Sequence, residues 1–141
     1  IVIDTSESCS GEYVRRFLEE TFSILMNKDN FFRKMNVHII QCDAKAQQDD
    51  VITSEEDMKR YMENFKLIGF GGTDFRPAFE YVNELCRKKV FRHLKGLLYF
   101  TDGYGTYPAR RPDYDVAFVF LEESYNDRHV PPWAIKLRIR P

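Results

Sequence analysis

The sequence predicts an α/β fold in which a mostly parallel sheet lies between layers of helices. Two observations support this prediction. Short apolar segments alternate along the chain with segments whose apolar residues recur at helical spacing, as they do when each strand is followed by a crossover helix. In addition, residues 115–121 carry apolar side chains in both alternating sets of positions. This pattern is typical of a strand that is buried on both faces of a sheet.

The first half of the chain contains three predicted strands and a long helix. Residues 1–4 form a short apolar strand, and residues 11–28 form an amphipathic helix. Residues 37–42 form a second apolar strand. The polar residues 47–53 are typical of a strand at the edge of a sheet.

The second half contains two further helices and three strands. A capping box of Thr53 and Glu56 predicts the start of one helix. After a glycine-rich loop, Thr73 or Asp74 caps the next helix, and Pro77 falls in its first turn. The remaining predicted elements are a strand at 96–101, a loop at 103–114, the strand at 115–121 and an edge strand at 135–139.

Length and charge limit the classes of function. A chain of 141 residues suits one core, so residues 1–141 are predicted to form a single domain. The formal net charge of −1 gives no electrostatic reason to expect a nucleic acid or an anionic membrane as partner. No apolar run approaches the roughly 20 residues that a transmembrane helix needs. The sequence leaves the oligomeric state open.

Two features concern the context of the chain. Ile1 already lies inside a predicted strand, so we expect the chain to be the C-terminal part of a longer protein. Cys9, Cys42 and Cys86 are odd in number and scattered, which argues against a disulfide framework. This usage of cysteine indicates a reducing, cytoplasmic location.

Oxygen-bearing side chains follow the first predicted strand. Asp4, Ser6 and Ser8 alternate there, and two further oxygen ligands, Thr73 and Asp102, stand after the glycine-rich loop and after strand 96–101. In parallel sheets, ligands bind beyond the carboxyl ends of the strands, where the strand order reverses. We expect these five residues to converge there if the strands that end at Asp4 and before Asp102 are neighbours.

Such a set of oxygens suits a hard cation. Mg²⁺ prefers six oxygen ligands, keeps several waters and takes one or two carboxylates. No His or Cys is placed to favour Zn²⁺. The sequence therefore predicts a Mg²⁺ site, also suited to Mn²⁺ or Ca²⁺, with a position left open for an acidic group of a protein partner. Each motif alone is equally well a helix cap or a turn, so the prediction rests on their combination.

Over nearly its whole length, the chain resembles a von Willebrand factor type A (VWA) domain. Asp4, Ser6 and Ser8 match the Asp-x-Ser-x-Ser element of the family's metal-ion-dependent adhesion site (MIDAS), and Thr73 and Asp102 match its separate threonine and aspartate. The resemblance implies a Rossmann-like, three-layer α/β/α fold. Its six-stranded sheet would have one antiparallel edge strand and helices on both sides.

More narrowly, residues 71–77 and 100–108 are similar to a bacterial VWA-like family of unknown function. Longer members of that family carry a metallopeptidase-like segment upstream and are considered partners of AAA+ ATPases. The resemblance thus implies an AAA+ ATPase as a partner. No His-Glu-x-x-His motif occurs in this chain, so no peptidase activity is expected of it.

The chain departs from the VWA pattern in three places. Glu7 stands where many VWA domains have Gly, and its carboxylate faces solvent, joins the cation site or repels an acidic ligand. Residues 104–114 are too few for a full helix with its loops, so one covering helix is expected to be reduced or missing. The sequence stops at Pro141, directly after the last predicted strand. The moving C-terminal helix of integrin-type domains is therefore not expected.

Further candidates surround the predicted site. Asp43, at the end of the second strand, reaches the rim of the site or serves as a turn residue, and Asp74 is a helix cap rather than a ligand. The loop after the last predicted ligand either contacts a partner or packs its Tyr rings over the sheet. Its Tyr and Arg residues are types favoured at interfaces: Tyr104, Tyr107, Arg110 and Arg111.

Two alternatives to a metal-dependent module remain. One is a VWA-like scaffold that binds protein without metal. The other is a Mg²⁺-dependent phosphatase of the haloacid dehalogenase type, which also places Asp at the end of a first strand. That class needs a second Asp at the position of Ser6. No Gly-x-Ser-x-Gly motif is present either, so we expect this domain not to be an enzyme.

Overall fold

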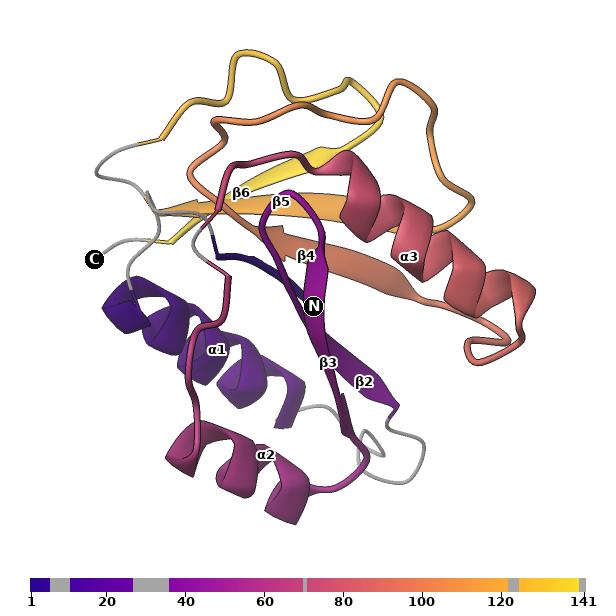
Figure 1. The fold of residues 1–141 in the computed structure, drawn as a ribbon. Helices are drawn as coiled ribbons and strands as arrows, with labels where there is room; N and C mark the ends of the chain where they lie inside the picture. The colour runs from indigo at the N-terminus through magenta and orange to yellow at the C-terminus, as the bar shows by residue number, and fades with distance from the viewer. Residues whose placement is uncertain (6–10, 27–35, 70, 122–124, 140–141) are drawn as a thin grey trace.

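The computed structural model describes residues 1–5, 11–26, 36–69, 71–121 and 125–139. Six strands form one sheet with the order β3-β2-β1-β4-β5-β6 (Figure 1). The strands are β1 (Val2–Asp4), β2 (Val37–Cys42), β3 (Ala46–Ile52), β4 (Gly96–Phe100), β5 (Asp115–Leu121) and β6 (Ile135–Ile139).

The short strand β1 lies at the point where the strand order reverses. It pairs in parallel with β2 on one side and with β4 on the other, so that Asp4 lies opposite Cys42 and Ile3 lies opposite Phe100. Strands β4, β5 and β6 are also parallel to one another, whereas β3 runs antiparallel to β2. The predicted sheet, mostly parallel with one antiparallel edge strand, is confirmed.

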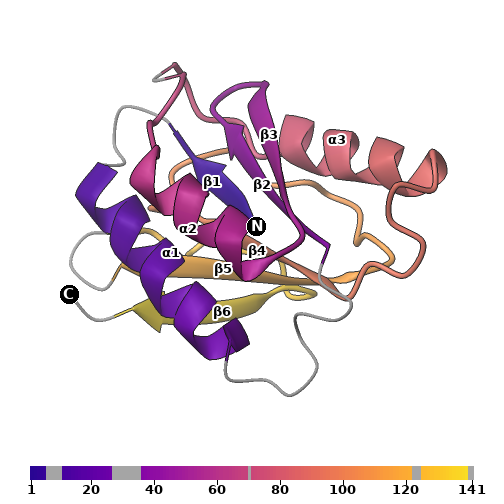
Figure 2. The ribbon, with the colours of Figure 1, turned by 90° about the horizontal axis from the view of Figure 1, so that it is seen from below.

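Helices cover both faces of this sheet. α1 (Gly11–Met26) and α2 (Glu55–Glu63) lie on one face, and α3 (Arg76–Arg87) lies on the other (Figures 1 and 2). Residues 101–114, which join β4 to β5, contain no helix, so the predicted loss of a covering helix is confirmed. None of the described helices is long and apolar enough to cross a membrane.

Alternate side chains of the strands form two apolar cores, because successive residues of a strand point to opposite faces. Ile3 belongs to the core beneath α1 and α2, whereas Val2 belongs to the core beneath α3. The α3 core is largely aromatic. The fully buried ring of Phe118 lies 5.5 Å from that of Tyr99 and 4.9 Å from that of Tyr107, measured between ring centroids.

The start of α2 differs by one residue from the prediction. Ser54, rather than Thr53, is the N-cap, and its hydroxyl accepts the N–H of Asp57 at 3.1 Å. Asp57 Oδ2 in turn accepts the N–H of Thr53 at 3.0 Å, which is the role expected of Glu56. The start of α2 is thus bonded in both directions, as in a capping box, but Asp57 accepts the N–H of the residue before the N-cap rather than that of the N-cap itself.

Replacing Phe118 with Ala should lower the free energy of unfolding by about 3–5 kcal/mol, because the substitution leaves a cavity among packed aromatic rings. Urea unfolding monitored by circular dichroism measures this change. Tyr104→Ala is the matched control, because the Tyr104 ring is 56% exposed; its effect should stay within about 0.5 kcal/mol. Similar losses for both variants would contradict the assignment of the core.

Candidate functional site

Asp4 is the last residue of β1 and is fully buried at the carboxyl edge of the sheet. Thr101, directly after β4, donates its hydroxyl proton to Asp4 Oδ2 at an O···O distance of 2.6 Å. The same hydroxyl oxygen accepts the N–H of Gly103 at 3.1 Å. Since a buried carboxylate is stable only with hydrogen-bond or charge partners, Thr101 both holds Asp4 and joins it to the turn that follows β4.

Asp102 lies in that turn and is partly exposed. Its Oδ1 accepts the N–H of Tyr104 at 3.2 Å, and its carbonyl oxygen accepts the N–H of Asn126 at 2.8 Å. Gly103 has φ +87, and a Cβ at this position would lie 1.8 Å from the Asn126 carbonyl oxygen. Asp4 and Asp102 therefore come from neighbouring parallel strands to one edge of the sheet.

Thr73 reaches this edge on the loop that precedes α3. A Cβ on Gly105 would lie 2.8 Å from Thr73 Cγ2, so the Thr73 loop packs against the loop after β4. The N–H of Phe75 also donates to the carbonyl oxygen of Thr106 at 3.0 Å. The structure thus brings together the loops of Asp4, Thr73 and Asp102. The other predicted residues, Ser6, Glu7 and Ser8, lie outside the described residues.

Asp43, directly after β2, anchors the glycine-rich loop. Its Oδ1 accepts the N–H of Lys45 at 3.1 Å and the side-chain N–H of Gln47 at 2.9 Å, and its Oδ2 accepts the N–H of Gly71 at 3.0 Å. Burial alone would raise the pKa of Asp43, but the hydrogen bonds from Gln47, Lys45 and Gly71 outweigh it and hold the pKa below its ordinary value. Asp43 therefore positions the loop at the rim of the site.

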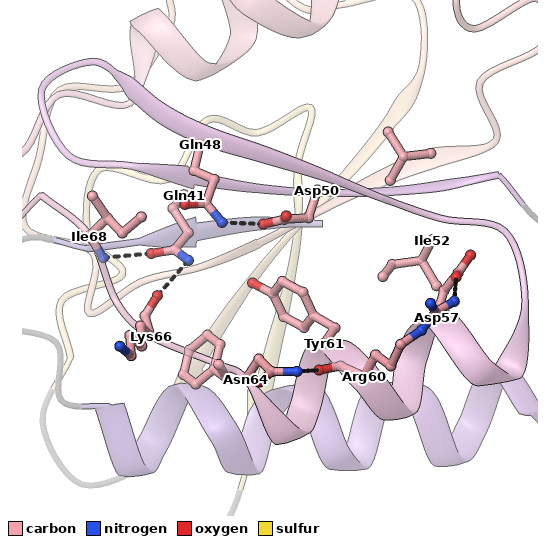
Figure 3. Close-up of a pocket in the computed structure, with 12 residues that line it drawn as sticks. Gln41, Gln48, Asp50, Ile52, Asp57, Arg60, Tyr61, Asn64, Lys66 and Ile68 are labelled. Atoms are coloured by element: carbon pink, nitrogen blue, oxygen red, sulfur yellow. Dashed lines mark hydrogen bonds and ion pairs between the residues drawn. The ribbon is translucent and has the colours of Figure 1, made fainter.

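Gln41, near the end of β2, fixes the part of the loop that precedes the glycines. Its amide nitrogen donates to the carbonyl oxygen of Lys66 at 2.9 Å, and its amide oxygen accepts the N–H of Ile68 at 2.7 Å (Figure 3). Gln41 also lines a pocket of about 460 Å³ between the β2–β3 pair and α2 (Figure 3). Two polar side chains from one strand end, Gln41 and Asp43, thus hold the loop that leads to Thr73.

Two buried hydroxyl residues at this edge, Thr5 and Thr101, were not predicted from the sequence. Thr5 is fully buried, and its hydroxyl has no hydrogen-bond partner among the described residues. A Cβ on Gly69 would lie 2.8 Å from Thr5 Oγ1 and 2.9 Å from Asp43 Oδ2, so both oxygens flank this glycine. Thr101 could have been found, because its hydroxyl stands at the end of an apolar strand. Thr5 occupies a variable position of the Asp-x-Ser-x-Ser motif, so no pattern in the sequence points to it.

Negative charge accumulates around these residues. Burial is the main reason that the pKa of the Cys42 thiol is raised to about 12; the nearby carboxylates of Asp43, Asp4 and Asp74 contribute to the rise, and a hydrogen bond with Tyr99 opposes it. Burial likewise raises the pKa of Tyr107 well above its ordinary value, and Asp102 and Asp4 add to this shift. Within the described ranges, no three His, Cys, Asp or Glu side chains gather as a metal cluster. The predicted cation site contains only two side chains of these types, Asp4 and Asp102, and its other ligands are Ser and Thr hydroxyls. The absence of a three-residue cluster among the described residues is therefore compatible with it.

Asp74 is neutralised by Arg76 at the start of α3. Arg76 Nε lies 3.0 Å from Asp74 Oδ1, and Arg76 Nη2 lies 2.8 Å from Asp74 Oδ2. This side-chain hydrogen bonding lowers the pKa of Asp74. The N-cap residue, Phe75, makes no side-chain bond, and Asp74 Oδ1 instead accepts the N–H of Arg76 at 3.0 Å. The prediction that Thr73 or Asp74 is the N-cap is therefore wrong, although Asp74 still supports the helix start from the position before the N-cap.

The loop after Asp102 divides into packed and exposed residues. The ring of Tyr107 lies 4.7 Å from that of Phe75, and its hydroxyl donates to the Gly103 carbonyl oxygen at 3.3 Å. Of the two readings of this loop, packing over the sheet therefore describes Tyr107. The exposed candidates for partner contact are Tyr104, Arg110 and Arg111.

A mostly parallel six-stranded sheet, with polar residues at the carboxyl ends of its first and fourth strands, defines a VWA-like α/β domain. The chain belongs to the family described as VWA-like domain (DUF2201), whose model matches residues 1–140. A VWA-like domain suggests a protein-interaction module.

A solved structure supports the fold. The chain is similar to proximal thread matrix protein 1 from the mussel byssus, with a TM-score of 0.70 and 12% sequence identity over 98% of this chain. The match spans 42% of that protein's chain, and at this identity it shows the fold alone. No curated protein matches the chain.

Gly103→Ala should lower the free energy of unfolding by more than about 2 kcal/mol, because the backbone has a positive φ and the methyl group meets the Asn126 carbonyl. Gly72→Ala is the control, since a Cβ at Gly72 has no atom within 4 Å. Its effect should stay within about 1 kcal/mol. Urea unfolding of both variants measures the difference, and equal effects would contradict the close approach of the two loops.

Asp43→Asn should lower the free energy of unfolding near neutral pH by about 1–3 kcal/mol, because the loop loses a charged acceptor. The folded-state pKa of Asp43 lies below its unfolded value. The stabilisation is therefore complete above the unfolded pKa, about 3.9, and is lost as the pH falls through the folded pKa. The gap between wild type and variant in urea unfolding should narrow under acid, whereas a gap independent of pH would refute the assigned role.

Proposed function

We propose that this chain is a protein-interaction module that holds Mg²⁺ at the carboxyl edge of its sheet and uses the ion to dock an acidic group of a protein partner. The proposed ligands are Asp4, Ser6, Ser8, Thr73 and Asp102. The observation that supports this proposal is the approach of the loops of Asp4, Thr73 and Asp102 where the strand order reverses. Ligand sites of open α/β sheets lie at this position.

The chemistry of the described residues fits a hard cation. Asp4 and Asp102 supply two carboxylates, which is the number that Mg²⁺ usually takes from a protein. The hydroxyl of Thr101 adds a neutral oxygen beside Asp4 and already orients one Asp4 oxygen. When bound, Mg²⁺ would supply a positive charge with an exchangeable coordination position. Asp43 and Gln41 would keep the Thr73 loop in place around it.

A protein partner with an exposed carboxylate fits this arrangement. The carboxylate would take the open coordination position, and the exposed Arg110 and Arg111 could pair with further acidic groups around it. An AAA+ ATPase is the partner class that the family resemblance suggests. No nucleic-acid or membrane partner is proposed, and the proposed location is the cytoplasm.

Isothermal titration with Mg²⁺ and Mn²⁺ tests the metal site. Wild-type protein should bind one ion, and Asp102→Ala should weaken binding by at least about tenfold, since even residues that only orient metal ligands cost this much. Asp4→Asn keeps the shape of the buried side chain and should have a similar effect. Asp113→Ala is the control because Asp113 is exposed and lies just before the start of β5, at the edge of the sheet opposite the carboxyl ends of the strands. Unchanged binding in both site variants would leave the metal-free scaffold as the better reading.

We propose no enzymatic activity for this domain. A generic phosphatase substrate with Mg²⁺ provides the check, and no turnover is expected because Ser6 stands where a general-acid Asp would be needed. Turnover that disappears in Asp4→Asn and persists in Asp113→Ala would instead establish the phosphatase alternative.

A further inference from the structure

Strand β6 is at the margin of the sheet and, within the part of the chain that the structure describes, pairs with another strand on one side alone. The sheet order ends at β6, which pairs with β5 through the register Ala117–Ile135 to Leu121–Ile139 (Figure 2). Edge strands present unpaired N–H and C=O groups that can bond to another extended chain. The backbone of β6 is therefore able to accept one more strand.

The side chains of β6 facing the α1 and α2 layer leave apolar surface exposed. Ile135 is 56% exposed and Leu137 is 45% exposed, although their partners on β5, Ala117 and Val119, are buried. An added strand with apolar residues on this face would extend the core outward by one row of side chains. Burial of such cross-strand neighbours is what stabilises strand pairing.

The opposite face of β6 carries an excess of positive charge among the described residues. Lys136 Nζ and Arg138 Nη2 each lie 3.8 Å from the same carboxylate oxygen, Asp127 Oδ2. The Arg138 guanidinium also lies 5.4 Å from the centroid of the Tyr125 ring, which orients it. Because the described residues place one carboxylate beside two exposed cations here, this face favours an added strand with acidic residues.

We propose that β6 is a second interaction surface, separate from the cation site, that binds an extended segment of a protein partner in which apolar and acidic residues alternate. Strand addition at a sheet edge is an established mode of peptide recognition, in which backbone bonds give affinity and alternate side chains give specificity. A second copy of β6 is disfavoured because it would place Lys136 and Arg138 against like charges.

The other edge of the sheet does not suit the same segment. β3 carries Asp49 and Asp50 on its two faces. Asp49 accepts the Tyr81 hydroxyl at 2.6 Å, and Asp50 accepts the Gln48 amide at 2.5 Å. Carboxylates along this edge would repel an acidic strand. The proposed partner therefore distinguishes β6 from β3 by charge.

Fluorescence anisotropy with a labelled peptide of about six residues, in which Glu and Val alternate, tests this surface. The titration is run in EDTA, so that its result does not depend on the proposed cation site. Binding should be seen below about 1 mM peptide, and a peptide of the same composition with its Glu and Val residues in two blocks should bind at least about tenfold more weakly. Protection of the β6 amides from hydrogen exchange would locate the peptide.

Two sets of variants decide the outcome. K136E/R138E should weaken binding of the Glu–Val peptide by at least about tenfold and create binding of a Lys–Val peptide, because the charges are exchanged. Val51→Asp, at the exposed β3 edge, should leave binding unchanged. Equal binding of alternating and block peptides, or no effect of K136E/R138E, would overturn the proposal. A dimer in sedimentation velocity that K136E/R138E abolishes would overturn it in favour of a second copy as the occupant.

Discussion

The hydrogen bond between the Thr101 hydroxyl and the buried Asp4 carboxylate is the interaction on which the candidate site depends. It joins the ends of β1 and β4, the two neighbouring strands at which the strand order reverses. Asp4 is 0% exposed, and a charged carboxylate in a low-dielectric interior costs free energy unless hydrogen-bond donors stabilise it. The Thr101 hydroxyl is one such donor. Because Thr101 also accepts the N–H of Gly103, the same hydroxyl fixes the turn that presents Asp102.

The loops around this bond are held from the strand ends rather than by their own secondary structure. Gln41 and Asp43, from the end of β2, bind the backbone between Lys66 and Gly71. Tyr107 and Phe75 pack the loops after β4 and before α3 against the aromatic core. Rigid β-strands thus position irregular segments, which is how open α/β sheets support binding sites. The carboxylates gathered there would provide the charge for the proposed hard cation.

The sequence was sufficient to predict the fold because short apolar strands and amphipathic helices alternate with little ambiguity. It placed Asp4, Thr73 and Asp102 at element ends, and strand order brings their loops together. It could not identify Thr5, since several hydroxyl residues follow the first strand and only the packing of the folded chain determines which of them is buried. It also assigned the cap of α2 to Thr53 instead of Ser54, because side chains one residue apart can make equivalent backbone bonds. The exposure of Ile135 and Leu137 on β6 could not be predicted either, because alternating apolar residues predict a strand but do not show which other elements cover it.

The most direct test of the cation site is the paramagnetic effect of Mn²⁺ on amide signals in a ¹⁵N–¹H NMR spectrum. Substoichiometric Mn²⁺ should broaden the amide signals of Thr5, Thr73 and Gly103 first, because these residues surround Asp4 and Asp102. The amide of Asp57, in the acidic first turn of α2, should remain sharp at the same concentration. Earlier broadening at Asp57 than at Thr5 and Gly103, or equal broadening along the chain, would contradict a cation site at the carboxyl edge of the sheet.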